Sequence, residues 1–274
     1  MRNALRKIFI SALALTFALF PLFACADNDF EEYNPLPEIV IGGDKYLPFF
    51  YFDDDGDFTG IDVELATEAC RLMNCKPRFV IMDWADKDKY LDEGTIDCLW
   101  ASFTRTDREE LYSWSAPYMN SRQVVAVAED SDIYSLADLK GKTVGVQSKT
   151  KPDDIFSGKS GRSAQIPAIK KLVCFNTADL MLASIREGYV DAIAGHETIL
   201  IEHMKSDSMN LRILSESLEE VQLGVAFKKG THAAVIERLN QALAIMQANG
   251  FVARTVQKYG LDPEKYTVVG YGRK

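Results

Sequence analysis

Apolar, β-prone runs alternate along this chain with amphipathic runs of helical spacing. The strand-like runs predict strands near residues 38–43, 77–81, 96–100, 122–128, 143–146 and 171–175. The helical runs predict helices near residues 61–73, 178–187 and 236–246. Alternation of this kind with short connections is typical of α/β folds whose sheets are mainly parallel. The 274 residues, 47% of them apolar, are enough for one large or two smaller domains.

The first residues have the pattern of an export signal. Three basic residues precede an apolar run over 8–24, which ends in Leu22-Phe23-Ala24-Cys25. This ending looks like a bacterial lipobox, in which Cys25 becomes the lipidated first residue. A plain transmembrane anchor is the alternative, and Pro21 and the short run argue against it. We expect residues 1–24 to be a lipoprotein signal peptide and residues 25–37 to be an acidic tether.

The net charge of −9 becomes more negative when the three basic residues of the signal are removed. No basic stripe is evident along the chain, so nucleic acid is a poor partner. Acyl chains on Cys25 would hold the protein at a membrane despite this charge.

Four further cysteines follow Cys25. An exported protein can form disulfides, and Cys70 could pair with Cys75 if the helix ends between them. Cys98 and Cys174 lie in apolar strands and are expected to be buried thiols. The sequence has no CxxC or HxxxH pattern, and it predicts neither a metal site nor a cofactor.

The most informative stretch for chemistry is residues 96–118. An apolar strand leads into the small and hydroxyl-bearing residues Ala101 to Thr104, and Arg108 follows. Small residues allow a ligand to approach the backbone, and a guanidinium grips a carboxylate with two hydrogen bonds. The alternative is a strand-to-helix loop whose Thr caps a helix and whose Arg is solvated.

This stretch resembles the family 3 solute-binding proteins, the polar amino acid binders of ABC importers. The elements that match are Asp97, Ser102 to Thr104, Thr106 with Arg108, and Trp114-Ser115-Ala116-Pro117-Tyr118. The spacing between Thr106 and Arg108 is one residue shorter than is common in the family. The spacing after Arg108 matches, so the resemblance makes Arg108 the carboxylate-binding arginine, with Arg105 as a competitor.

A second match covers residues 46–66. In the family, the aromatic residue two before the proline covers the ligand, and this residue is Tyr46 here. Phe50 belongs to the same dense aromatic cluster and is a further candidate for ligand contact. The family often has an acid five residues before the proline; Gly43 stands there, with Asp44 one place later. Trp84 is either a helix-packing anchor or a ligand wall.

Two more matches lie in the second half of the chain. Thr150 or Lys151, standing before Pro152, reads as the N-cap of a helix, which is either an ordinary helix start or part of a ligand site. In the family this helix tip holds the ligand's carboxylate opposite the arginine. The family's Gly-x-Val-Asp-Ala element occurs at 188–192, and the residue five after its Asp is usually an acid that holds the α-ammonium. His196 stands at that position here. It is either a structural histidine or a site residue, and then either Glu197 takes over the acid's role or the ligand is not a standard α-amino acid.

The resemblance implies an α/β, two-lobed periplasmic-binding-protein-like (type II) fold with two hinge crossover strands. Lobe one would comprise residues 38–122 and 223–268, and lobe two residues 123–222. The implied function is an extracytoplasmic, lipid-anchored and monomeric protein that captures a small carboxylate-bearing ligand and delivers it to an ABC permease. The alternatives are a ligand-sensing subunit and, on the same fold, a dehydratase, although we expect no enzymatic activity. The predicted ligand-binding residues are Tyr46, Phe50, Trp84, Ser102, Thr104, Arg108, Thr150, Lys151, His196 and Glu197.

Overall fold

The computed structural model describes residues 36–206 and 209–268. The predicted signal peptide, Cys25 and all but two residues of the predicted tether lie outside the described residues. The strands are β1 (Glu38–Gly43), β2 (Tyr51–Phe52), β3 (Phe58–Thr59), β4 (Lys76–Ile81), β5 (Cys98–Leu99), β6 (Ser113–Trp114), β7 (Met119–Ala128), β8 (Thr143–Gln147), β9 (Lys171–Phe175), β10 (Ala192–His196), β11 (Leu211–Leu223) and β12 (Ala226–Phe227). The helices are α1 (Ile61–Leu72), α2 (Lys87–Asp92), α3 (Lys151–Phe156), α4 (Ala178–Arg186), α5 (Glu197–Ser206), α6 (Ala233–Ala248), α7 (Phe251–Lys258) and α8 (Pro263–Tyr266), with short 3₁₀ turns at Trp84–Asp86, Leu136–Leu139 and Gly161–Gln165.

Two five-stranded sheets form the framework. The first has the order β4-β1-β5-β12-β6 and the second has the order β11-β7-β10-β8-β9. β1 pairs in parallel with β4 and β5, and β8 pairs in parallel with β9 and β10. The remaining pairs within these two sheets, which involve β7, β11 and β12, are antiparallel. The parallel pairs follow from the strand–helix alternation, whereas the antiparallel pairs form at β7 and β11, by which the chain passes between the sheets, and at β12, which follows β11.

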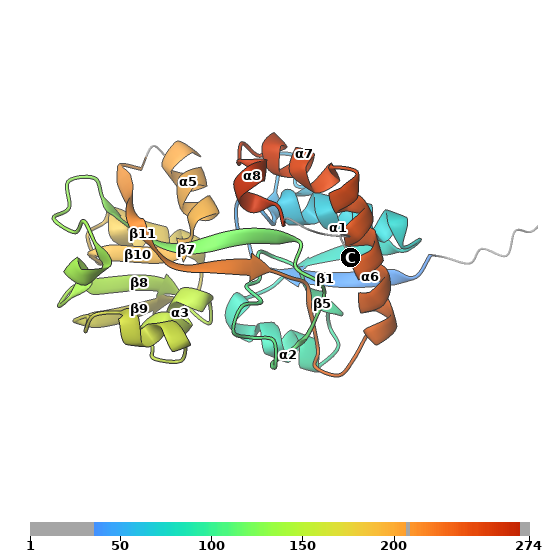
Figure 1. Cartoon of the computed structure of the whole chain (residues 1–274), viewed down its shortest axis with the longest axis horizontal. Coiled ribbons are helices and arrows are strands. Elements are labelled where there is room, and N and C mark those ends of the chain that lie inside the picture. The colour runs from blue at the N-terminus through green and yellow to red at the C-terminus, as the bar shows by residue number, and fades with distance from the viewer. Residues whose placement is uncertain (1–35, 207–208, 269–274) are drawn as a thin grey trace, which may run out of the picture. The chain divides into compact units, whose positions relative to one another are not determined.

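Two long strands connect the sheets. β7 and β11 run antiparallel from the pair Met119 and Leu223 to the pair Ala128 and Leu211. Figure 1 shows both strands extending from the helices α1, α6 and α8 to the strands β8 to β10. They are the two crossover strands that a hinge between two lobes requires. The predicted boundaries at 122/123 and 222/223 both fall at these strands, and they stay a prediction.

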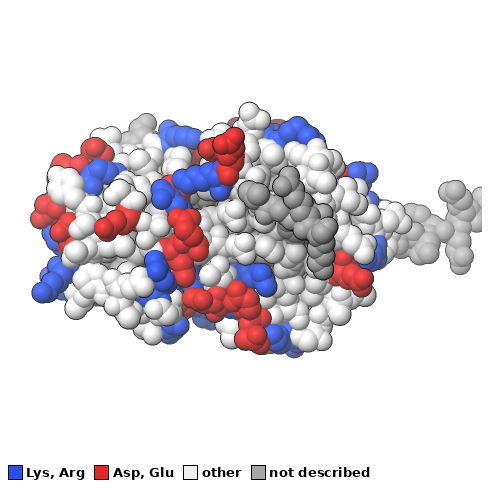
Figure 2. Space-filling model, in the orientation of Figure 1, with Lys and Arg blue, Asp and Glu red and all other residues white. Residues whose placement is uncertain are grey.

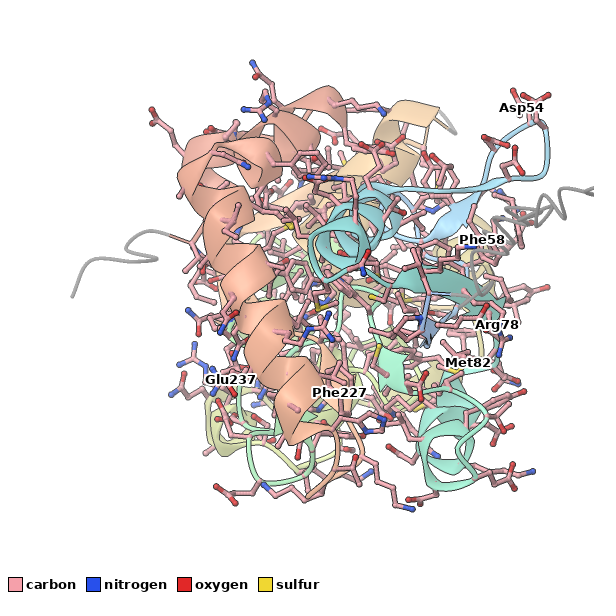
Figure 3. The ribbon with its side chains drawn as sticks, turned by 90° about the vertical axis from the view of Figure 1, so that its right-hand side faces the viewer. Asp54, Phe58, Arg78, Met82, Phe227 and Glu237 are labelled. Atoms are coloured by element: carbon pink, nitrogen blue, oxygen red, sulfur yellow. The ribbon has the colours of Figure 1, made fainter. Side chains whose placement is uncertain are left out.

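Phe50 belongs to the core of the first sheet, and its contact with a ligand stays a prediction. Its ring is fully buried, with its centroid 5.3 Å from that of Phe58 and 5.8 Å from that of Phe79. Phe58 lies beside the strands of this sheet in Figure 3. Gly60 holds the aromatic segment against α1, because a Cβ at this residue, whose φ is +122°, would lie 2.3 Å from the carbonyl oxygen of Phe49.

The cysteines differ in part from expectation. Cys70 and Cys75 are free thiols, and Cys75 Sγ donates to the carbonyl oxygen of Cys70 at 3.5 Å, so the suggested disulfide is not formed. Cys98 is buried as predicted. The prediction of a buried Cys174 was wrong, because its strand β9 lies at the edge of the second sheet and leaves the thiol exposed.

The described surface carries mixed charge. On the face seen in Figure 2, lysine and arginine side chains are interspersed with aspartate and glutamate. Asp54 projects from the turn between β2 and β3 (Figure 3). Within residues 36–206 and 209–268, no group of three or more His, Cys, Asp or Glu side chains is placed to hold a metal ion. Within the same residues, no helix has the length and apolar character needed to cross a membrane.

Candidate functional site

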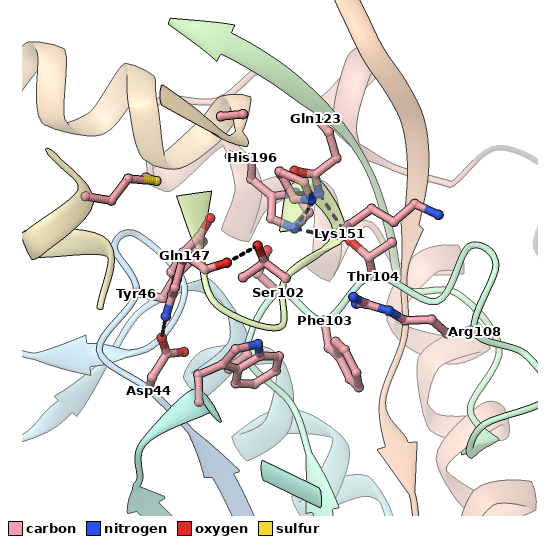
Figure 4. Close-up of a pocket in the computed structure, with 17 residues that line it drawn as sticks. Asp44, Tyr46, Ser102, Phe103, Thr104, Arg108, Gln123, Gln147, Lys151 and His196 are labelled. Atoms are coloured by element: carbon pink, nitrogen blue, oxygen red, sulfur yellow. Dashed lines mark hydrogen bonds between the residues drawn. The ribbon is translucent and has the colours of Figure 1, made fainter. Parts of the chain in front are cut away.

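A pocket lies between the two sheets, where the strands end. Asp44 follows β1 and Ala101 to Thr104 follow β5 on the first sheet, while Gln147 ends β8 and His196 ends β10 on the second. In Figure 4, Gln147 reaches toward Asp44, and His196 lies beside Thr104. Ligand sites of open α/β sheets lie beyond the carboxyl ends of the strands, so this is the expected place for one.

The segment after β5 is fixed by a buried carboxylate. The amide of Ser102 donates to Asp62 Oδ2 at 2.5 Å, and Asp62 lies fully buried in the first turn of α1. This bond accompanies a left-handed backbone at Ser102, whose φ is 52°. Burial raises the pKa of Asp62 to about 7, against the lowering effect of the Ser102 amide. Asp62 therefore shapes the pocket wall from behind without lining the pocket.

Arg108 is the guanidinium of the pocket. Its side chain is 7% exposed, and its Cζ lies 5.3 Å from the centroid of the Phe103 ring. Its Nη2 donates to Asp154 Oδ2 at 2.5 Å and to the carbonyl oxygen of Lys149 at 3.4 Å. Arg105, the competing arginine, does not line the pocket and instead borders a surface groove beside Trp114.

His196 lies in the wall formed by the second sheet. Its Nδ1 is 2.9 Å from Ser121 Oγ, and its Nε2 is 3.3 Å from Thr104 Oγ1 and 3.0 Å from Gln123 Nε2. Burial, with a smaller effect from Arg108, lowers the pKa of His196 to about 3. The ring is therefore neutral at physiological pH and can accept a hydrogen bond, but it supplies no negative charge to an ammonium group.

Asp44 places a carboxylate in the pocket, although it stands one residue after the position at which the family often has an acid. It is 8% exposed, lines the pocket and accepts a hydrogen bond of 2.6 Å from Gln147 Nε2. Burial raises its pKa to about 6. A side chain at Gly43 would be blocked, because a Cβ there would lie 2.6 Å from the Cβ of Ala101. The acid therefore reaches the pocket from the next residue.

The start of α3 also lines the pocket, and the predicted N-cap is confirmed in its position but not in its capping hydrogen bond. Thr150 is at the N-cap position, yet its hydroxyl donates back to the carbonyl oxygen of Gln147 at 2.6 Å and accepts no helix amide. Lys151 is 2% exposed, and its Nζ lies 2.7 Å from Asp107 Oδ2 and 3.1 Å from Glu219 Oε2. Two carboxylates thus neutralise Lys151 next to the pocket.

Most of the residues predicted from the sequence come together here. Those that line the pocket are Tyr46, Trp84, Ser102, Thr104, Arg108, Thr150, Lys151 and His196. Phe50, in the core, and Glu197 do not line it. That these ten residues bind a ligand stays a prediction.

Glu197 is engaged outside the pocket. It pairs with Arg122, with Lys265 at 2.5 Å and with the hydroxyl of Tyr266 at 2.7 Å. Burial opposes its ionisation, but these three hydrogen bonds outweigh burial and lower its pKa to about 2. Because α8 provides two of the partners, this side chain joins the start of α5 to the C-terminal part of the chain and does not take over the role of the acid replaced by His196.

The sequence reasoning missed several lining residues. Gln147 ends a predicted buried strand and Gln123 lies in a predicted crossover strand, so a polar amide in an otherwise apolar run was the available signal. The other lining residues that were not predicted, Ala101, Phe103, Pro152, Met181, Ala194 and Gly195, carry no distinguishing chemistry.

The pocket is narrow, and some polar atoms of its lining residues lack hydrogen-bond partners. Its cavity has a volume of about 30 Å³, roughly room for one water molecule. Three buried polar atoms of its lining residues have no hydrogen-bond partner among the described residues: Trp84 Nε1, Ser102 Oγ and Gln123 Oε1. Buried polar atoms are usually hydrogen-bonded, so these three are available to a ligand once the walls separate.

Comparison with known proteins gives a consistent result. Residues 39–262 match the bacterial extracellular solute-binding proteins, family 3. The chain is 31% identical over 224 residues to the L-cystine-binding protein TcyA of Bacillus subtilis. This alignment covers 80% of each chain.

Solved structures agree with this result. An ancestral arginine-binding protein bound to arginine superposes with a TM-score of 0.73 at 26% identity, over 81% of this chain and 97% of the other. A substrate-binding protein of an ABC uptake transporter from Streptococcus pneumoniae with bound histidine superposes with a TM-score of 0.76 at 24% identity, over 82% and 93%. The second likeness concerns the fold alone.

Proposed function

Because the chain belongs to the family 3 bacterial extracellular solute-binding proteins, we propose that it captures a small carboxylate-bearing ligand, an amino acid or analogue, by hinge closure and delivers it to an ABC importer. The observation that carries this proposal is the placement of Arg108 between the two sheets. A buried guanidinium beside hydroxyl-bearing loops is suited to bind a carboxylate.

Lipid anchoring is part of the same proposal. The lipobox-like ending at Cys25 supports an extracytoplasmic protein that is held at the cell membrane by acyl chains. In that position the protein would meet a permease without diffusing away.

Closure follows from the location of the contacts. Arg108 and Ser102 belong to the first sheet, and Lys151 and His196 to the second, so a ligand can contact all four only when the cleft is closed. Contacts that exist in one state alone shift the population toward that state. The cavity must first widen to admit an amino acid, and β7 and β11 are the strands about which it can do so.

The charges of the pocket suggest how the ligand is oriented. Asp44 and Arg108 lie on opposite sides of the pocket in Figure 4, and neutral His196 lies above both of them in this view. The ligand would place its carboxylate at Arg108 and a cationic or other hydrogen-donating group at Asp44. An α-ammonium would meet only hydrogen-bond acceptors near His196.

A dehydratase on this fold has less support. The neighbouring residues His196 and Glu197 could serve such an enzyme as acid–base groups, but they do not meet at the pocket, because Glu197 is bound by Arg122, Lys265 and Tyr266. The homologue TcyA is, by its name, a binding protein.

A thermal-shift screen tests the proposed function. The purified protein is heated with each standard L-amino acid, with L-cystine and with simple mono- and dicarboxylates. We expect a rise in Tm with at least one amino acid and none with its decarboxylated amine, since Arg108 needs a carboxylate. A ligand at about 100 times its Kd stabilises the folded state by about 2.7 kcal/mol, which is readily detected. A screen in which no amino acid or carboxylate raises the Tm would contradict the proposal.

Asp44→Asn tests the ligand's orientation. We expect this variant to bind a ligand that carries a cationic group at the end remote from its carboxylate at least about tenfold more weakly, because the carboxylate that faces this group is lost. Binding of a simple carboxylate of similar length should change little. Calorimetric titration of both compounds measures the difference, and equal losses for the two would rule out the assigned orientation.

A further inference from the structure

The shortest polar contact of Arg108 is with Asp154, on the opposite side of the cleft. Arg108 lies in the connection between β5 and β6 of the first sheet, and Asp154 lies on α3, between β8 and β9 of the second. Their Nη2 and Oδ2 atoms are 2.5 Å apart, and the Asp154 side chain is 26% exposed. The Asp154 carboxylate therefore already pairs with the Arg108 guanidinium. In the proposed function, the same guanidinium binds the carboxylate of the ligand.

We propose that Asp154 is an internal competitor for the ligand: in the closed cleft it pairs with Arg108, and the incoming carboxylate takes its place. This inference rests on the proposed function, because it needs Arg108 to be the group that binds the ligand.

Competition follows from space and charge. The cavity of about 30 Å³ beside Arg108 does not hold a carboxylate and the chain attached to it. The cleft must open for a ligand to enter, and opening separates Arg108 from Asp154, since they belong to different sheets. When the cleft closes again, two carboxylates at one buried guanidinium repel each other, and this repulsion favours exchange of one for the other.

The neighbouring cations strengthen the effect of removing Asp154. Lys87 Nζ donates to the carbonyl oxygen of Lys149 at 3.5 Å, the same oxygen that accepts from Arg108. Burial, together with the charges of Arg108 and Lys149, lowers the pKa of Lys87 to about 8, although Asp88 and Asp154 oppose this shift. Without Asp154 these cations would have less negative charge facing them, and they would attract a ligand anion more strongly.

The competing explanation is that Asp154 orients Arg108 for the ligand. The two explanations differ in sign. A competitor lowers the apparent affinity, because the fraction of molecules closed by the internal pair cannot bind until it opens. An orienting residue raises the affinity, because it fixes the guanidinium in its binding position.

Asp154→Asn is the decisive variant, and Asp179→Asn is its matched control. Asp179, on α4, pairs with Lys45 of the first sheet at 3.0 Å, so the control also removes one carboxylate and one ion pair across the cleft. It leaves Arg108 untouched. Both variants and the wild type are stripped of bound compounds by unfolding and refolding, and are then titrated with L-cystine and L-arginine by calorimetry.

We expect Asp154→Asn to bind whichever of L-cystine and L-arginine the wild type binds about three- to tenfold more tightly than the wild type does. A change of this size is what the loss of a partly buried ion pair implies. Asp179→Asn should stay within about twofold of the wild type. Unchanged or weaker binding by Asp154→Asn would overturn the proposal.

A second measurement needs no ligand. In small-angle scattering of the stripped proteins, Asp154→Asn should have a larger radius of gyration than both the wild type and Asp179→Asn, since the internal pair no longer closes the cleft. Equal radii for the three proteins would overturn the proposal. If the wild type bound neither an amino acid nor a carboxylate, the proposed function would fail while the scattering comparison still decided whether Asp154 closes the cleft.

Discussion

His196 shows at the scale of a single residue how burial decides what a side chain can do. Its position, five residues after Asp191, was visible in the sequence, and the resemblance to the family implied a residue at the cleft there. Its neutral state could not be predicted, because that state depends on burial by segments far away in the sequence and, to a smaller extent, on the positive charge of Arg108. For the same reason the sequence could not exclude Glu197, whose partners Lys265 and Tyr266 come from the C-terminal end of the chain.

The stability of the protein should therefore fall in mild acid because of His196. The pKa of His196 is lowered from 6.5 to about 3 in the folded protein, so the unfolded chain takes up a proton first as the pH falls below 6.5. The stabilisation is complete above pH 6.5 and is lost progressively toward pH 3. Between pH 7 and pH 5 the wild type should lose about 2 kcal/mol more free energy of unfolding than His196→Gln. Urea unfolding of both proteins at the two pH values measures the difference, and parallel losses would show that His196 titrates normally.

At the scale of secondary structure elements, the sequence predicted the strands and helices better than their surroundings. The start of α1 after Gly60, the buried strand β8 and the crossover strand β7 all lie where the apolar pattern placed them. The exposure of Cys174 and the burial of Phe50 were not predictable in the same way. Apolar runs identify strands, but only the order of strands in the sheet tells which strand lies at an edge, and only packing tells which aromatic ring lies inside.

Replacement of Phe50 tests its assignment to the core. Phe50→Ala should lower the free energy of unfolding by about 3–5 kcal/mol, because it leaves a cavity among Phe58 and Phe79. Phe52 is 46% exposed, and Phe52→Ala should cost about 1 kcal/mol or less. Urea unfolding gives both values. A Phe50→Ala protein of normal stability that no longer bound its ligand would instead make Phe50 a pocket residue.

At the scale of the described unit, residues 36–206 and 209–268, the two sheets and the connecting strands β7 and β11 form the architecture that the proposed hinge closure requires. Each wall of the pocket comes from loops at the ends of strands, so the site is complete only when the sheets approach each other. The pairs Arg108 with Asp154 and Lys45 with Asp179 both span this gap, and the exposed Lys45–Asp179 pair contributes little to closing it. The account depends on one contact across this site, between Arg108 and the carboxylate of a ligand.

Calorimetric titration of Arg108→Ala with the amino acid selected by the thermal-shift screen tests that contact most directly. Arg105→Ala is the matched control, because Arg105 lies three residues earlier in the same connection and does not line the pocket. We predict that Arg108→Ala weakens binding by at least about thirtyfold, equivalent to about 2 kcal/mol, while Arg105→Ala binds like the wild type. Unchanged affinity in Arg108→Ala, or an equal loss in Arg105→Ala, would contradict the account.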